Sequence, residues 1–236
     1  TGSLLLDPTN ITISKSAGSH TSISTSGSTT LEPSAAAGSV ISLSTLNTAL
    51  GSSNVTIQTA AGGGSELGNI TVDTGSAITG ANDLTITADG DFTMLSGSIN
   101  LGAGDLTITT GNTNDEGTIL VFADVTAGDI VLSADDTAQL TGAVDVSGGG
   151  GTITANLSQP ASSFTANDIA SAATISATTN NGNITIEGSG NLSINAISAG
   201  TGQVEITSTG GSINDHASDS TADITADEID LTAATG

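Results

Sequence analysis

The sequence predicts an all-β protein, a parallel β-helix (a solenoid) with coils of about 20–25 residues. An apolar–polar–apolar triplet behind a Gly, Asn or Asp turn begins at Leu84, Leu106, Ile130, Ile153 and Ile175, at spacings of 22 to 24 residues. The chain is rich in Gly, Thr and Ser and shows no long stretch of apolar residues at helical spacing. Three Phe, without Trp or Tyr, leave a thin core of small and branched side chains, which suits stacked sheets.

The expected strands follow in chain order. The triplet phrases occupy residues 68–75, 81–90, 102–111, 127–136, 182–190 and 226–236. Weaker strand candidates lie between them at residues 91–94, 98–101, 118–122 and 143–146. Each period therefore holds two or three short strands.

Strand alternation directs Leu84 and Ile86 into the core, and Thr85 and Thr87 outward. Each coil has to place an equivalent strand above the last one, so the preceding turn needs a residue that accepts positive φ. Asn side chains at these turns are also expected to form hydrogen bonds along the rod. Each end of such a rod exposes a sheet edge, and the sequence shows no evident cap for either edge.

One domain is predicted over residues 1–236, with the weakest repeat regularity at 1–50 and 155–180. Later triplets begin at Ile184, Val204 and Ile229, so the period slips between residues 175 and 184. About ten coils, stacked about 4.8 Å apart, would make a rod about 50 Å long. A β-sandwich with a strand every 8 to 12 residues is the competing fold, but it does not need the longer repeat.

Charge excludes several classes of partner. The chain has 24 acidic residues and a single basic one, Lys15, which gives a formal net charge of −23. Such a field repels phosphate backbones and anionic membrane surfaces, so nucleic-acid binding is not expected. No apolar run approaches the length of a membrane span, so membrane insertion is not expected either. Without Cys, neither disulfides nor thiolate metal sites can form.

The phrase "GSLLLDPTNITIS" at residues 2–14 resembles a phrase common in large exoproteins of the filamentous haemagglutinin type. The rest of the chain is similar to these exoproteins in composition only, because it is rich in Gly and Thr and has no Cys. The resemblance implies a right-handed β-helical shaft, secreted from a Gram-negative bacterium by two-partner secretion. It also implies a role in adhesion, aggregation or biofilm scaffolding at the cell surface, with self-association or extracellular matrix components as partners.

An enzyme is not expected, although a carbohydrate-active β-helical enzyme is the alternative. Lyases of this fold use Arg or Lys, and here Lys15 stands alone near one end. Asp135 and Asp136 form the most suggestive carboxylate pair for glycoside hydrolysis, but they are sequence neighbours in a polar turn, and the chain has no Trp or Tyr to hold a sugar. His20 and His216, the two histidines, lie far apart in sequence and receive no role.

A calcium-dependent binding module is the third class. Calcium prefers several carboxylate and carbonyl oxygens on flexible loops. The candidates are Asp89, Asp91, Asp115, Glu116, Asp135, Asp136, Asp215, Asp219, Asp223 and Asp227. None fits an EF-hand loop or a glycine-rich calcium nonapeptide, so acidic turns that keep the rod soluble are preferred, and no cofactor is required.

The outward Thr rows also resemble the flat faces of β-helical ice-binding proteins. Thr85 and Thr87 begin such a row in the sequence. The row is expected to be broken by Val131 and Ser133, and later by the acidic residues Glu187, Glu205 and Asp230 at outward positions of the later triplets. An ice-binding face is therefore not predicted.

Overall fold

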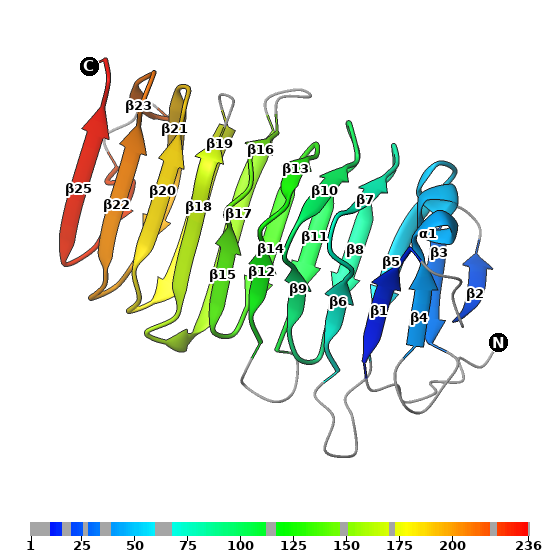
Figure 1. Cartoon of the computed structure of the whole chain (residues 1–236). Helices are drawn as coiled ribbons and strands as arrows, with labels where there is room; N and C mark the ends of the chain where they lie inside the picture. The colour runs from blue at the N-terminus through cyan, green and yellow to red at the C-terminus, as the bar shows by residue number, and fades with distance from the viewer. Residues whose placement is uncertain are drawn as a thin grey trace.

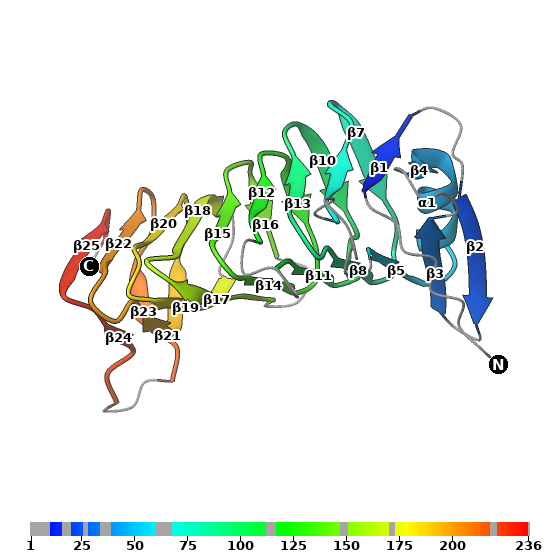
Figure 2. The ribbon, with the colours of Figure 1, turned by 90° about the horizontal axis from the view of Figure 1, so that it is seen from below.

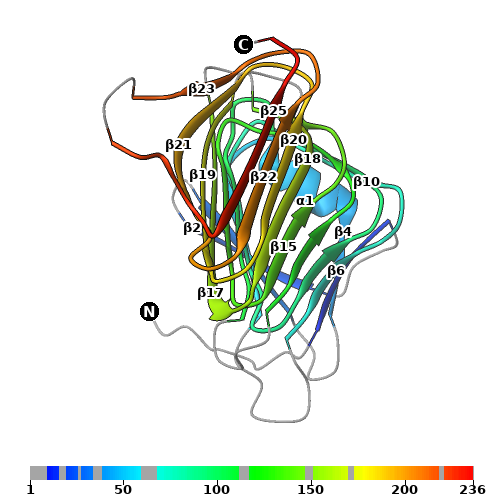
Figure 3. The same cartoon turned by 90° about the vertical axis from the view of Figure 1, so that its left-hand side faces the viewer.

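The structure is a computed structural model that describes residues 10–15, 20–25, 28–33, 39–59, 68–111, 117–146, 151–169, 173–217 and 221–235. Strands of successive coils lie side by side along a single axis (Figure 1), and in the view onto the C-terminal end they lie behind one another (Figure 3). Among the described strand pairs all are parallel except β2 with β3. The predicted β-helix is confirmed, and a β-sandwich is excluded.

The N-terminal region differs from the regular coils. Its elements are β1 (Ile11–Ser14), β2 (His20–Thr25), β3 (Ser28–Pro33), β4 (Ser39–Ser42), α1 (Leu43–Leu50) and β5 (Asn54–Gln58). β2 and β3 form an antiparallel hairpin that continues into the parallel ladder through β5, and β4 pairs with β1. This region carries the weakest sequence repeat because it does not form complete coils.

About seven turns follow, rather than the ten expected from the length of the chain. Their strands are β6 (Ile70–Val72), β7 (Ser76–Thr79), β8 (Leu84–Thr87), β9 (Phe92–Met94), β10 (Gly97–Asn100), β11 (Leu106–Thr109), β12 (Ile119–Val121), β13 (Asp124–Thr126), β14 (Ile130–Ala134), β15 (Thr137–Leu140), β16 (Val144–Asp145), β17 (Thr152–Pro160), β18 (Ser163–Ile169), β19 (Ala173–Asn180), β20 (Ile184–Gly188), β21 (Leu192–Ser198), β22 (Gln203–Ser208), β23 (Ile213–Asp215), β24 (Ile224–Thr225) and β25 (Glu228–Ala233). Fewer turns fit because the N-terminal region holds a hairpin and a helix.

Two long sheets enclose the core. Sheet A contains 14 strands and runs from β4 to β25, and sheet B contains 11 strands and runs from β2 to β23 (Figure 2). The early coils contribute two short strands to sheet A, as β15 and β16 do. At β18 these two strands merge into one, because β18 pairs with both β15 and β16. The irregular stretch at 155–180 is therefore the place where three-stranded coils become two-stranded ones.

The register confirms the predicted alignment of triplets. Leu84 pairs with Leu106, which pairs with Ile130, and the same column of sheet B continues through Ile153 to Ile175. All five side chains are fully buried. The later triplets form a column of their own in sheet A, in which Ile184, Val204 and Ile229 pair in turn. The irregular period between residues 175 and 184 therefore marks the point at which the recurring triplets pass from sheet B to sheet A.

The helix α1 closes part of the N-terminal end, which corrects the expectation of an all-strand chain without a cap. The Ser42 hydroxyl accepts a hydrogen bond from the Thr45 N–H (3.2 Å) and caps the first turn of the helix. Leu46 is fully buried against the core. Asn47 takes the place of a neighbouring strand for β7: its amide donates to the Ala77 carbonyl and its oxygen accepts the Thr79 N–H, both at 3.0 Å.

Side chains of the turns join one coil to the next, as the sequence predicted for Asn. The oxygen of Asp83 accepts the Asp105 N–H (3.0 Å), Asp105 accepts the Asp129 N–H (2.9 Å), and Asp129 accepts the Thr152 N–H (2.7 Å). A second ladder before sheet A links Asn10, Asn69, Asp91 and Thr118 in the same way. The acidic turn residues therefore supply backbone N–H groups with partners.

Replacing Asp105 with alanine should lower the free energy of unfolding by about 1–3 kcal/mol, because it leaves the Asp129 N–H without its acceptor. Asp105→Asn keeps an acceptor and removes the middle charge of three stacked carboxylates, so it should equal or exceed the wild type at low salt. Urea denaturation at about 10 mM and about 0.5 M NaCl measures both effects. Equal destabilisation by Ala and Asn would contradict the role of the acceptor.

Candidate functional site

The acidic residues considered as calcium ligands are spread over the rod. Asp89 is buried (2% exposed) in the turn behind β8, and Asp91 accepts the Thr118 N–H (2.9 Å) in the second turn ladder. Asp135 and Asp136 lie where β14 turns into β15. Asp89 and Asp91 share the turn from β8 to β9, and Asp135 and Asp136 share the turn from β14 to β15, two coils further along the rod, so the two pairs do not form one cation site.

Three further candidates lie at the C-terminal end, and the others cannot be placed. Asp215 ends β23, and Asp223 and Asp227 flank β24. Asp115, Glu116 and Asp219 lie outside the described residues. Within the described ranges, no three His, Asp or Glu side chains gather where they could hold a metal ion.

The two histidines lie at opposite ends of the molecule. His20 belongs to the N-terminal hairpin, and His216 follows β23. The Nδ1 of His216 lies 3.3 Å from the Thr174 hydroxyl and 3.2 Å from the Ser193 hydroxyl, on an exposed surface. Both contacts join the imidazole to hydroxyl groups of sheet B strands, and the structure gives His216 no catalytic role.

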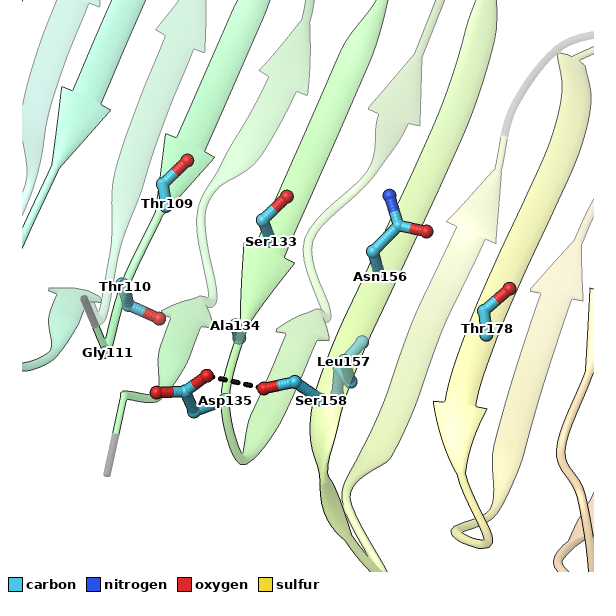
Figure 4. A pocket seen from close by; sticks show the side chains of 10 residues that line it. All are labelled: Thr109, Thr110, Gly111, Ser133, Ala134, Asp135, Asn156, Leu157, Ser158 and Thr178. Carbon is cyan, nitrogen blue, oxygen red and sulfur yellow. Dashed lines mark hydrogen bonds between the residues drawn. The ribbon is translucent and has the colours of Figure 1, made fainter. Parts of the chain in front are cut away.

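A hollow lies on the outer face of sheet B, where the strands end. It is a cavity of about 400 Å³ crossed by one row of outward side chains (Figure 4). The row consists of Thr109, Ser133, Asn156 and Thr178, and the register aligns them on four successive strands from β11 to β19. β17 and β19 run on beyond the residues that align with the end of β11.

One carboxylate stands at the end of this cavity. Asp135 accepts a hydrogen bond from the Ser158 hydroxyl (2.5 Å), as Figure 4 shows. On its other side lies Gly111 with a φ of +79°, and a Cβ there would collide with the carboxylate. The glycine thus makes room for the carboxylate, and the serine holds its orientation.

A buried hydroxyl completes the site. Thr110 is only 3% exposed and lines the same cavity, yet its Oγ1 has no hydrogen-bond partner among the described residues. The equivalent positions in the neighbouring coils hold Ala88 and Ala134, which follow their strands in the same register. Sequence analysis missed Thr110, although aligning the triplet phrases shows a Thr in a column where its neighbours have Ala.

The outer face of sheet B carries no charge on its described strands from β5 to β21. The expectation that acidic residues interrupt its Thr row is wrong. Glu187, Glu205 and Asp230 belong to β20, β22 and β25, which are strands of sheet A. The row on sheet B is varied only by uncharged residues such as Val131 and Asn156. A polar but neutral strip therefore runs along a protein of net charge −23.

No protein-family model, curated protein or solved structure matches the chain. Within the part of the chain that the structure describes, no helix has the length and apolar character needed to cross a membrane.

Proposed function

We propose that the chain is a structural segment of an extracellular adhesive or matrix protein, secreted to the surface of a Gram-negative bacterium. Its role is adhesion, aggregation or biofilm scaffolding, performed by a stiff rod without reaction chemistry and without a required cofactor. The likeness of residues 2–14 to haemagglutinin-type exoproteins supports the setting, and the end of that phrase forms β1. The observation that carries the proposal is the continuous core.

That core runs unbroken from β1 to β22. A single apolar cluster extends from Ile11 in β1 to Ile206 in β22. Parallel ladders and turn side chains join each coil to the next, so the coils cannot bend independently. A rod of this kind transmits force and sets a fixed distance between its ends, which are the properties that a shaft needs.

The two ends of sheet A support end-to-end association. β4 and β25 are outermost at the two ends of the rod, and each pairs on one side only among the described strands, whereas β7, the third end of the sheet, is bordered by α1. On β25, Ile229 and Leu231 stand in register with the buried Val204 and Ile206, yet they are 47% and 48% exposed. A strand laid beside β25 would bury both side chains. β4 carries no charged residue, so like-charge repulsion with β25 does not oppose head-to-tail pairing.

Head-to-tail contacts between identical chains do not close on themselves and generate filaments. Sedimentation velocity over a range of concentrations, with electron micrographs taken with and without calcium, should reveal growing rods of the wild-type chain. Calcium dependence would place the acidic turn residues at the joints between rods.

The double variant Ile229→Lys with Leu231→Lys should remain monomeric under the same conditions, because it places two charges on the apolar end. Leu95→Lys is the matched control: Leu95 is 50% exposed, but it lies in the turn behind β9, away from the ends. Its association should equal that of the wild type. Wild-type chains that stay monomeric at every concentration, or a double variant that still associates, would contradict end-to-end assembly.

A further inference from the structure

The strand β25 is outermost at the C-terminal end of the rod, and no other described strand covers its outer edge (Figures 1 and 2). All its residues are exposed. Ile229 and Leu231 stand on the core side, in register with buried residues of β22, and Glu228 and Asp230 stand on the outer side. Such an edge can pair with two strands of a second copy, either β4 at the N-terminal end or β25 itself.

Pairing of β25 with its own counterpart would join two rods tail to tail. The two strands would run antiparallel across a two-fold axis perpendicular to sheet A. This axis keeps the core sides of both strands on the same side of the joined sheet, so Ile229 and Leu231 of both copies would become buried. Because side chains alternate along a strand, only registers that place outer residues opposite outer residues preserve that burial.

Every such register brings carboxylates of the two copies together. Pairing Ile229 with Leu231 of the second copy sets the two Asp230 side chains directly opposite each other. Sliding the strands by two residues pairs Leu231 with its own counterpart and leaves the Asp230 residues on diagonal positions, about 7–8 Å apart. Sliding them the other way pairs Ile229 with its counterpart and sets Glu228 opposite Asp230. Like charges at opposite positions destabilise a strand pair.

The strand β4 offers an edge without this conflict. It carries the buried Ile41 on the core side, and the half-buried Val40 stands on the outer side, in register with Thr12. None of its four residues is charged. A parallel pair of β25 with β4 of a second copy therefore buries Ile229 and Leu231 without setting carboxylates against one another.

The charges of the two rod ends favour the same choice. From residue 203 onward the described part of the chain holds acidic residues but no Lys or Arg, and Asp215 and Asp223 line a hollow beside Leu231. Up to residue 59 the described part holds Glu32 and Lys15, whose charges cancel. A tail-to-tail contact brings two acidic ends together, whereas a head-to-tail contact joins an acidic end to a nearly neutral one.

We propose that Asp230 determines which partner the C-terminal end accepts: it rejects β25 of a second copy and leaves β4 as the strand that fits. Specific interfaces commonly use a repulsive contact of this kind against the wrong partner. Rods then join head to tail, in one direction, and not tail to tail in closed pairs. The inference rests on the end-to-end association of the proposed function and names the residue that gives this association its polarity.

The test compares pairing in chains whose head-to-tail contact is blocked. Val40→Asp places a carboxylate on the outer side of β4, facing the acidic side of β25, and should stop the growth of rods. In this background Asp230→Asn should yield dimers and nothing larger, with a Kd about tenfold lower than that of Val40→Asp alone. Sedimentation velocity at about 20 mM NaCl, where repulsion is weakly screened, measures both quantities.

Glu205→Gln in the same background is the matched control. Glu205 stands beside Asp230 in the same outer column, but on β22, one strand further from the end. Its replacement gives the same net charge as Asp230→Asn and should leave the Kd of the Val40→Asp chain unchanged. Circular dichroism of each variant verifies that the rod is folded.

An introduced cysteine supplies a second readout, which does not depend on blocking β4. The chain has no Cys, so Asp230→Cys introduces a single thiol. In a tail-to-tail pair the two thiols face each other on residues whose Cα atoms lie about 4.5–5.5 Å apart, within the range of a disulfide. Head-to-tail neighbours hold them a rod length apart. Mild oxidation should therefore link Asp230→Cys chains into covalent dimers, and Glu205→Cys chains should stay unlinked.

The proposal is overturned if Val40→Asp with Asp230→Asn stays monomeric, if the Glu205→Gln control dimerises equally well, or if the two cysteine variants are linked to the same extent. Any of these results beside growing wild-type rods overturns this inference alone. Wild-type chains that stay monomeric, while the Asp230→Asn chain dimerises, overturn the head-to-tail filament of the proposed function and leave the role of Asp230 against tail-to-tail pairing intact.

Discussion

Replacing Phe164 with alanine is expected to lower the free energy of unfolding by about 3–5 kcal/mol, the range for a fully buried Phe that leaves a cavity. Phe164 lies in β18, is 0% exposed, and is one of the two largest side chains of the core. In its column it stands between Ala138 and Ile184. Ala138 is too small to fill the space left behind, and the ladders on both sides prevent the coils from closing over it. Urea denaturation followed by circular dichroism measures the loss.

Phe122→Ala is the matched control for this prediction. Phe122 is 41% exposed in the turn behind β12, so its removal leaves no internal cavity. Its effect should stay within about 0.5 kcal/mol, as for surface substitutions in general. Similar losses in the two variants would mean that Phe164 does not fill the core as described.

The regular coils could be predicted because each coil repeats the environment of the one before. An inward Leu or Ile has to stand over its counterpart, so Leu84, Leu106 and Ile130 recur at nearly constant spacing and reveal the register. The turn ladders follow from the same constraint, since the residue before each strand faces the same backbone N–H of the next coil. The periodicity of the sequence therefore predicts the fold wherever successive coils are alike.

The N-terminal region could not be predicted in this way, because it does not repeat. The helix α1 has eight residues, and its signals are the Ser42 cap with Leu46 and Leu50 one turn apart. Such a short helix is stable only because these leucines pack against the core and Asn47 bonds to β7. Those contacts are tertiary and leave no periodic trace in the sequence.

The alternation of apolar and polar residues also does not show to which of the two sheets a strand belongs. The triplets at Leu84 and Ile184 look alike, yet the first lies in sheet B and the second in sheet A. For that reason Glu187 was expected to interrupt a Thr row that it never meets. The hollow beside Asp135 leaves no such signal for a related reason: the hydrogen bond to Asp135 comes from Ser158 in the next coil, and Thr110 lines the hollow from the preceding coil.

Gly97→Ala should be about as damaging as the loss of Phe164, for a different reason. Gly97 begins β10 with a φ of +117°, a conformation that costs an L-residue about 1–2 kcal/mol. A Cβ there would also overlap the carbonyl oxygen of Ser76, a backbone atom in the adjoining strand that cannot move aside without breaking the pairing of β7 with β10. Forced overlap of this kind adds about 1–3 kcal/mol, so the expected total is about 2–5 kcal/mol.

Gly102→Ala separates these two costs. Gly102 also has a positive φ, +59°, but a Cβ at this position has no atom within 4 Å. Only the cost of the positive φ applies at Gly102, so thermal unfolding should show that the free energy of unfolding falls by about 1 kcal/mol. If the two variants lost the same amount, the close approach of coils at Ser76 would not limit stability. A larger loss at Gly97 would instead place the tightest constraint of the rod at the contact between successive coils, where neither side can yield without disturbing its neighbour.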